Sequence, residues 1–327
     1  MKIKQSEIKR ILFITLSNIG DIVLTTPVLR ALSENFPASA IDVMVSPAGI
    51  GLFEKHPAVS DVISYDKRSG LRDKLRLIAR LRRADYDFVA DMRNSLFRFL
   101  IGSRYGTDPF RAAPKGIRHK KLRHLWKLSS MGIGVGQEDF RFYLHIPPGD
   151  GEYVKKIMAG PGRGRPLVAI SPGAKSSVKR WPEEKYAELA GRLVRDLGCG
   201  VIMVGDGEDA PLVKKIISSS GAGIADFSGR TTLCQLASVL SECDMLITND
   251  SAPLHIAGAV GTRTLAIFGP TDPAAYGPTG ADDRVVRKKI KCVPCGKAQC
   301  RFNHECMRLI ETEEVFEAAK DMLKDRR

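Results

Sequence analysis

Two series of short apolar runs that alternate with amphipathic segments dominate this 327-residue chain. The first series begins at residue 11, and the second restarts at residue 167. Between them, two helix-breaking stretches at 147–150 and 160–166 flank one expected helix over 152–158. Strands that alternate with helices form a parallel sheet covered on both faces. The sequence therefore predicts an α/β protein with two Rossmann-like domains, residues 1–150 and 151–327, that face a central cleft.

Expected strands are continuous apolar runs, and expected helices carry one apolar stripe. In the first half we expect strands at 11–16, 41–45, 61–65 and 87–91, and helices at 22–36 and 71–83. In the second half we expect strands at 167–171, 201–205, 245–248 and 264–268, and helices at 183–197, 210–218, 233–240, 252–260 and about 313–324. The helix over 71–83 is strongly basic on the face that opposes its apolar stripe, which consists of Leu71, Leu75, Ile78 and Leu81.

The positive charge is concentrated in the first half of the chain. Residues 1–150 contain 25 Lys and Arg against 15 Asp and Glu, which is +10 of a formal net charge of +14. Such an excess favours an anionic substrate, an anionic membrane surface or nucleic acid as partner. A basic protein without an anionic partner is the alternative. Binding to nucleic acid is disfavoured, because the basic residues lack interleaved aromatic residues and no nucleic-acid-binding motif occurs.

Targeting signals are not evident in the sequence. No apolar run approaches the length of a membrane span. The first residues, MKIKQSE, are followed by a short strand-like run and an aspartate, which is not the pattern of a signal peptide. We therefore expect a cytoplasmic protein.

The segment from Thr248 to His255, with the sequence TNDSAPLH, joins an expected strand to an expected helix. A helix N-terminus offers free backbone N–H groups and the positive end of a dipole, so it can hold a diphosphate. Asp250 and His255 add side chains able to contact a sugar or a ribose. The alternative is an ordinary turn in which Asp or Ser caps the helix.

Two other polar loops follow expected strands of the second half. The loop over 171–182 contains Lys175 and Lys179 beside a glycine, which suits a phosphate group, although the Walker spacing is absent. The loop after residue 205 contains Glu208, and an acidic residue at this place can bind ribose hydroxyls. A turn followed by a helix cap is the alternative for that loop.

In the first half, the sequence SNIGD occupies the first strand-to-helix loop, from Ser17 to Asp21. A carboxylate at the mouth of the cleft can take a proton from an attacking hydroxyl. The alternative role of Asp21 is to cap the following helix. The loop is not a GxGxxG motif, which disfavours a dinucleotide-dependent dehydrogenase.

Five motifs follow one another along the chain: SNIGD with TP, PGAK with KRWP, GDGE, NDSAPLH and FGPTDP. Together they resemble the motifs of the ADP-heptose:lipopolysaccharide heptosyltransferases, glycosyltransferase family nine, which has the GT-B fold. The resemblance covers nearly the whole chain. It implies an inverting, metal-independent transfer of heptose from ADP-heptose to the inner core of lipopolysaccharide, with no cofactor required. Transfer of another sugar, or to another glycan acceptor, is the alternative, because Ser251-Ala252 stands where the family often has Thr-Gly.

The resemblance also implies roles for individual residues. Asp21 matches the family's catalytic base. A lysine and a helix N-terminus would stabilise the negative charge that develops on the departing ADP. The residues implied in donor binding are Lys175, Lys179, Glu208, Thr231, Thr232, Asp250, Ser251 and His255.

The acceptor implied by the resemblance is Kdo-lipid A or the heptosylated core, which carries phosphates and acidic sugars. Ser17, Arg93 and Asn94 are the expected acceptor contacts. A basic run is either a further contact or a solvated surface, and it consists of Arg104, Arg111, Lys115, Arg118, His119, Lys120, Lys121 and Arg123. We expect a protein that is peripheral on the inner face of the inner membrane, bound electrostatically through the helix over 71–83 or the loop after Gly102.

Four cysteines lie close together in the last part of the chain: Cys292, Cys295, Cys300 and Cys306. With His304 among them, their spacing resembles a zinc knuckle, and a structural zinc ion is one hypothesis. Buried or disulfide-forming thiols without metal are the alternative. The chemistry that the resemblance implies does not require this metal.

Overall fold

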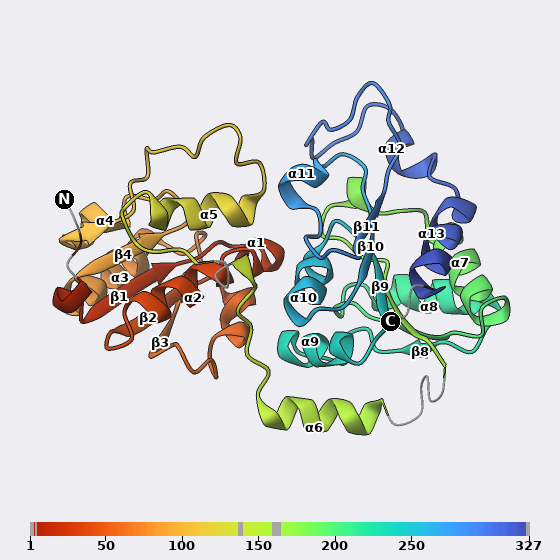
Figure 1. Ribbon diagram of the computed structural model, residues 1–327, viewed down its shortest axis with the longest axis horizontal. Coiled ribbons are helices and arrows are strands. Elements are labelled where there is room, and N and C mark those ends of the chain that lie inside the picture. The colour runs from red at the N-terminus through yellow and green to blue at the C-terminus, as the bar shows by residue number, and fades with distance from the viewer. Residues whose placement is uncertain (1–2, 4, 137–139, 159–164, 325–327) are drawn as a thin grey trace. The chain divides into compact units, whose positions relative to one another are not determined.

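The computed structural model describes residues 3, 5–136, 140–158 and 165–324 of the chain (Figure 1). The chain forms two compact units, Met1–His145 and Ile146–Arg327. Each unit contains its own parallel β-sheet with helices packed on it. The α/β fold that the alternation of strands and helices predicts is therefore confirmed.

The sheet of the first unit has the strand order β3-β2-β1-β4-β5, with all neighbours parallel. The chain moves outward from β1 to β3 and then places β4 on the other side of β1, so the strand order reverses between β1 and β4. Ligands of open α/β sheets bind beyond the carboxyl ends of the strands at such a point. The strands are β1 (Arg10–Ile14), β2 (Ala40–Val45), β3 (Asp61–Ser64), β4 (Phe88–Asp91) and β5 (Tyr105–Gly106).

The helices of the first unit are α1 (Ile19–Val23), α2 (Thr26–Asn35), α3 (Leu71–Arg83), α4 (Phe97–Ile101) and α5 (Lys120–Ser129). The single helix expected over 22–36 was wrong, because α1 and α2 are separate. Pro27 lies in the first turn of α2, where a missing N–H is tolerated, but it cannot continue a helix that began earlier. The hydroxyl of Thr25 donates to the carbonyl of Ile22 at 2.7 Å and helps to end α1.

The sheet of the second unit has the order β11-β10-β9-β6-β7-β8, and its strand order reverses between β6 and β9. Every position of β6, β7, β9 and β10 is buried, as expected for parallel strands that are covered on both faces. The strands are β6 (Leu167–Ser171), β7 (Gly200–Met203), β8 (Ala225–Asp226), β9 (Met245–Asn249), β10 (Thr264–Ile267) and β11 (Arg284–Val286).

Helices cover both faces of this second sheet. Figure 1 shows α9 and α10 on one face, and α7, α8 and α13 on the other. The helices of the unit are α6 (Pro148–Ile157), α7 (Glu183–Arg195), α8 (Ala210–Ser220), α9 (Leu233–Ser241), α10 (Ala252–Val260), α11 (Pro273–Tyr276), α12 (Glu305–Arg308) and α13 (Thr312–Lys324).

The expected break at 147–150 directly follows the division between the two units at His145 and Ile146, and α6 begins within it. Pro147 is the N-cap residue and Pro148 the first helical residue, a place where proline is favoured because the first N–H has no partner in the helix. Helix α6 packs on α9, and Asp150 accepts a hydrogen bond from Nε2 of Gln235 at 2.9 Å. Residues 160–164 of the other expected break lie outside the described residues.

Within the described ranges, none of the helices combines the length and the apolar character that crossing a bilayer requires.

Candidate active site

In the second unit, the loops that follow β6 and β9 meet at the point where the strand order reverses. Lys179 ends a short 3₁₀ helix, Ser177–Lys179, in the loop after β6, and Asp250 directly follows β9. Nζ of Lys179 lies 2.6 Å from Oδ2 of Asp250. The carboxylate side chain is 6% exposed and the lysine side chain 31%. The pair therefore holds an ammonium group at the rim of the sheet, with its counter-ion buried beneath it.

Asn249, the last residue of β9, fixes the relative position of these two loops. Its side-chain oxygen accepts hydrogen bonds from the backbone N–H of Trp181 at 3.1 Å and the hydroxyl of Tyr186 at 3.0 Å. Its Nδ2 donates to the carbonyl of Pro172 at 2.8 Å. Asn249 is fully buried, so each of these bonds replaces hydration that the polar groups lose on folding. Sequence reasoning gave this residue no role, although an amide at the end of an apolar strand was a visible signal.

Helix α10 begins immediately after Asp250, with Ser251 as its N-cap residue. The hydroxyl of Ser251 does not cap the helix but lies 3.1 Å from Oγ1 of Thr248. The backbone N–H groups of the first turn are therefore not taken up by the side chain of the N-cap residue. They lie beside the Lys179–Asp250 pair, which brings a helix dipole and an ammonium group to one place. His255 is buried within α10.

The loop after β7 contacts the loop after β6. Asp209 places its carboxylate where a Cβ on Gly173 would lie, at 2.2 Å, so only glycine allows this approach. Oδ1 of Asp206 accepts the backbone N–H groups of Glu208, at 2.9 Å, and of Asp209, at 3.0 Å. This turn leaves the side chain of Glu208 exposed, next to the other polar loops of the same sheet edge.

Three other expected donor residues are placed as follows. Thr232 is the N-cap residue of α9 and forms a capping box with Gln235, whose backbone N–H donates to the threonine hydroxyl at 3.2 Å. The neighbouring Thr231 is half-buried. Lys175 is exposed on the loop after β6. Thr232 thus has a structural role that the sequence pattern did not reveal.

In the first unit, Asp21 lies in α1, which follows β1. Asn18 is the N-cap residue of α1, so the helix-cap role considered for Asp21 was wrong. Nδ2 of Asn18 donates to Oδ2 of Asp21 at 3.0 Å. Asp21 is half-buried, and Ser17 is held through its carbonyl, which accepts the hydroxyl of Ser46 at 2.8 Å.

A second group of polar residues follows β4, the strand beside β1. Asp91 is buried, and its Oδ1 accepts the backbone N–H of Arg93 at 2.7 Å. Asn94 has a left-handed backbone with φ of 58°, and its side-chain oxygen accepts from Nζ of Lys127. The guanidinium of Arg93 lies 4.8 Å from the ring centre of Tyr65. Burial lowers the pKa of Lys127. The structure thus adds Lys127, which sequence reasoning had missed, to Arg93 and Asn94.

Much of the basic run is used to hold the first unit together. Arg104 forms an ion pair with Glu7 at 3.0 Å, and Arg123 donates to the carbonyl of Ile117 at 3.0 Å. Lys121 is buried over the ring of Phe142. Arg111 donates to the carbonyl of Ser130, and His119 is the N-cap residue of α5. Each of these residues therefore has a contact within the unit.

The four clustered cysteines differ in their burial. Among the described residues, no three His, Cys, Asp or Glu side chains are arranged to hold a metal ion. Cys306 is buried against Gly269, whereas Cys295 and Cys300 are exposed. Burial, together with the charges of the other three thiols, raises the pKa of Cys306 to about 11.

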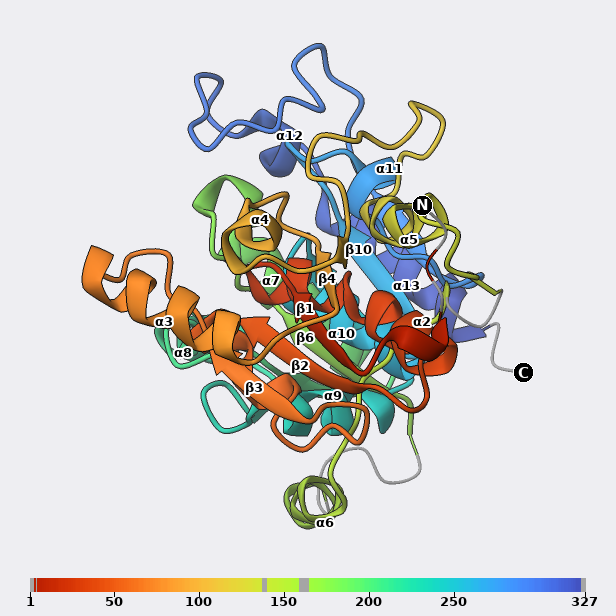
Figure 2. The same cartoon turned by 90° about the vertical axis from the view of Figure 1, so that its left-hand side faces the viewer.

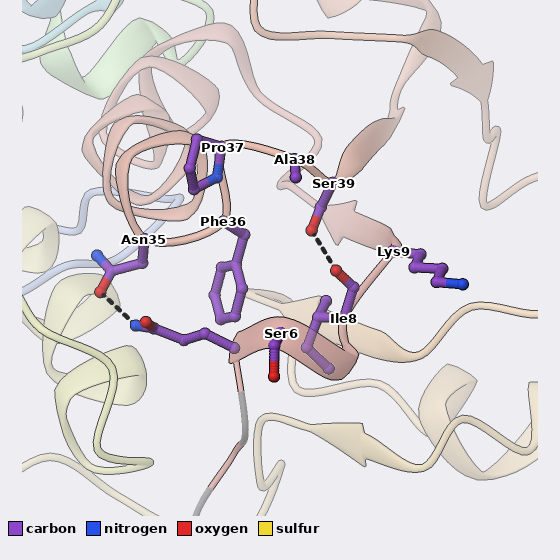
Figure 3. Close-up of a pocket in the computed structure, with 9 residues that line it drawn as sticks. Ser6, Ile8, Lys9, Asn35, Phe36, Pro37, Ala38 and Ser39 are labelled. Atoms are coloured by element: carbon purple, nitrogen blue, oxygen red, sulfur yellow. Dashed lines mark hydrogen bonds between the residues drawn. The ribbon is translucent and has the colours of Figure 1, made fainter.

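A cavity on the first unit lies away from these polar loops (Figure 3). Its lining comes from the segments that precede β1 and β2, so it lies at the amino ends of the strands. Gln5 donates to Asn35 at 3.3 Å, and the hydroxyl of Ser39 donates to the carbonyl of Ile8 at 2.6 Å. The ligand-binding edge of a parallel sheet is the opposite one, so this cavity is not the candidate site.

Comparison with known proteins identifies the family of this chain. Residues 74–305 match the model of glycosyltransferase family 9 (heptosyltransferase). Lipooligosaccharide heptosyltransferase 2 of Campylobacter jejuni is 25% identical over 317 residues, which cover 94% of this chain and 96% of that protein. Lipopolysaccharide heptosyltransferase 2 of Salmonella typhimurium is 28% identical over 309 residues, which cover 85% and 88%.

Solved structures show the same fold. The glycosyl transferase family 9 protein from Veillonella parvula superimposes with a TM-score of 0.83 at 24% identity, covering 97% of this chain and 98% of that one. The ADP-heptose lps heptosyltransferase II of Escherichia coli gives 0.78 at 24% identity, covering 96% and 98%. The chain has two parallel sheets of the GT-B type with polar loops at their carboxyl edges, and the family model matches most of its length. This protein is therefore a glycosyltransferase that belongs to glycosyltransferase family 9, the heptosyltransferase family.

Proposed function

We propose that this protein transfers heptose from ADP-heptose to the inner core of lipopolysaccharide, with inversion at the anomeric carbon. The relatives named above are heptosyltransferases of lipopolysaccharide or lipooligosaccharide. The acceptor is Kdo-lipid A or the form that already carries one heptose. In the reaction, the acceptor oxygen forms a bond to the anomeric carbon while the bond from that carbon to the diphosphate breaks, and ADP leaves.

The observation that carries the proposal is the Lys179–Asp250 pair beside the N-terminus of α10. A lysine ammonium has three N–H donors, and Asp250 takes one of them while fixing the position of the group. Charge develops on the diphosphate as ADP departs. An ammonium and a helix N-terminus that are in place beforehand stabilise that charge without reorganisation. We assign Lys175, Ser251 and His255 to the same donor site, and Glu208, Thr231 and Thr232 to its nucleoside part.

Asp21 is the proposed general base. It is half-buried, and it accepts a hydrogen bond from Asn18, which orients the carboxylate. As the acceptor hydroxyl attacks, its proton passes to Asp21. Ser17, Arg93 and Asn94 are the proposed acceptor contacts, and Lys127 supplies a second positive charge beside Arg93. Two cations at the end of β4 suit an acceptor that carries phosphates and acidic sugars. The acceptor is a lipid, so the protein would act at the inner face of the inner membrane.

The test is ADP release by the purified protein, supplied with ADP-heptose and either Kdo-lipid A or its mono-heptosylated form. Turnover with one acceptor supports the proposal and tells which heptose is added. Absence of turnover with both, in protein that binds ADP, would contradict the proposed donor sugar or acceptor while leaving the nucleotide site in place. Replacing ADP-heptose by other ADP-sugars in the same assay separates these two outcomes.

A further inference from the structure

Half of the apolar stripe of helix α3 is exposed. Leu81 is buried in the core of the first unit, and Leu77 and Ile78 pack partly against the same core. Leu75 and Leu71, about one and two turns further toward the N-terminus, are 56% and 73% exposed. Figure 2 shows this end of α3 extending beyond the edge of the sheet. An apolar stripe that continues past the core is available to cover, or to enter, another surface.

Helix α4 adds more exposed apolar side chains to the same region. Helices α3 and α4 are in contact, and Nε of Arg82 donates to the carbonyl of Leu100 at 2.6 Å. Around α4, Leu96, Phe99 and Leu100 are 53%, 57% and 42% exposed. We call the exposed apolar residues of the two helices the α3–α4 patch: Leu71, Leu75, Leu96, Phe99 and Leu100.

The patch is surrounded by positive charge. Helix α3 carries six basic residues and one acidic residue. Arg76 pairs with Asp73 and Arg80 with Asp61. For Arg72, Lys74 and Arg83, no ion pair forms with any of the residues that the structure describes. Exposed apolar side chains beside unpaired cations are the pattern of a helix that lies in a lipid–water interface.

We propose that the α3–α4 patch docks the protein on an anionic phospholipid bilayer. The leucines and Phe99 enter the region between headgroups and acyl chains, and Arg72, Lys74 and Arg83 face the lipid phosphates. The complementarity of charge selects this occupant, because a purely apolar protein partner would leave these cations without counter-ions. The inference deepens the proposed function, on which it rests for the lipid nature of the acceptor.

The experiment measures binding of the full-length protein to vesicles by co-sedimentation. Vesicles of phosphatidylcholine alone are compared with vesicles that contain phosphatidylglycerol, at low and high salt. We expect binding only to the anionic vesicles, and weaker binding in high salt. The charge variant Arg72→Gln/Lys74→Gln should lower the partition coefficient about 25-fold, at about fivefold for each lost cation.

The apolar variant Leu71→Gln/Leu75→Gln tests the other half of the patch. It should lower the partition coefficient on the order of tenfold without changing the charge. The matched controls are Lys155→Gln/Lys156→Gln, which removes two exposed cations from α6, and Leu309→Gln, which removes an exposed leucine after α12. Both controls should bind as the wild type does. All substituted side chains are exposed or half-exposed, and circular dichroism should show unchanged folding.

Two outcomes overturn the inference. One is that the wild type fails to bind anionic vesicles, or that both patch variants bind as well as the controls. The other is that the wild type forms a dimer in gel filtration that Leu71→Gln/Leu75→Gln dissociates, because the patch is then an interface between copies of the chain.

A kinetic readout keeps this inference separate from the proposed function. With a de-acylated, water-soluble acceptor, the patch variants should show wild-type rates. With the same acceptor in anionic vesicles, their apparent KM should rise as binding falls. If no acceptor is turned over at all, the proposed function fails while vesicle binding still tests the patch. If the soluble acceptor is turned over but vesicles are not bound, only the patch inference fails.

Discussion

The two units have sheets of the same kind, but the polar loops at their carboxyl edges differ in how firmly they are held. In the second unit, the buried Asn249 ties the loops after β6 and β9 together, and Lys179 pairs with Asp250. In the first unit, Asp21 has its hydrogen bond from the exposed Asn18. A site built in advance suits the stabilisation of a diphosphate, whereas a half-exposed carboxylate suits a base that must meet an incoming hydroxyl.

The largest effect should come from Asp21→Asn, because the amide keeps the shape of the carboxylate but cannot accept the proton. We expect the turnover number to fall by about a hundred- to ten-thousand-fold. The affinity for ADP, measured by calorimetry, should not change, since the proposed ADP site lies in the second unit. Asp85→Asn is the matched control in the same unit, at a position with φ of 51° that asparagine also tolerates. A fully active Asp21→Asn enzyme would remove Asp21 from the reaction.

The stability of the second unit should depend on Asn249. Replacement by alanine leaves the N–H of Trp181, the hydroxyl of Tyr186 and the carbonyl of Pro172 without their partner. We expect a loss of about 3 kcal/mol in the free energy of unfolding in urea, together with weaker ADP binding. If Asn249→Ala unfolds at the same urea concentration as the wild type, the difference that we describe between the units does not hold.

Acid should weaken the first unit through a buried histidine. Burial, and then the charge on His145, lowers the pKa of His56 from 6.5 to about 4. Between pH 6.5 and pH 4, His56 binds a proton in the unfolded chain but not in the folded chain. The stability that the neutral, buried His56 contributes is therefore complete above pH 6.5 and is lost as the pH falls toward 4. The loss should be about 3 kcal/mol. Urea unfolding between pH 7 and pH 4 should show a shallower dependence for His56→Gln, and an unchanged one for His304→Asn. Equal slopes in all three proteins would contradict the assignment.

The smallest effect should come from Lys179→Ala, measured as ADP affinity. Loss of one charge-assisted contact to the diphosphate should weaken binding about tenfold. Alanine also leaves Asp250 buried without its counter-ion, so Lys179→Ala should be less stable than the double variant Lys179→Ala/Asp250→Asn. The control is Lys214→Ala, on the exposed face of α8. An unchanged ADP affinity in Lys179→Ala would exclude this lysine from the donor site.

The fold was largely predictable because its local signals agree with one another. The expected strand over 167–171 coincides with β6, and the one over 245–248 is one residue shorter than β9. Where local signals competed, prediction failed. Pro27 divided one expected helix into α1 and α2, and Pro148 began α6 four residues before the start expected at residue 152. Proline disfavours the middle of a helix but favours its first turn, and the sequence alone did not tell which of these applied.

Residues of the candidate site were predictable by type but not by partner. The motif around Asp250 marked a polar strand end, whereas its pairing with Lys179, 71 residues away in the sequence, appears only in the folded chain. The same holds for Lys127, which α5 brings to the end of β4. The cysteine spacing left a zinc site and metal-free thiols as alternatives, and packing buries Cys306 while Cys295 stays exposed. Sequence spacing constrains how far apart two thiols lie, not which of them the core takes up.

The sequence by itself determined the two α/β halves, the polar loops after the strands and the basic character of the first half. These properties follow from hydrophobic periodicity, turn residues and charge, which act over a few neighbouring residues. Only the tertiary structure decided which loops meet where the strand order reverses, which cations become structural, and that Leu71 and Leu75 stay exposed while Leu81 is buried. Burial is set by contacts between segments that are distant in the chain, so one and the same apolar stripe can serve the core at one end and a surface at the other.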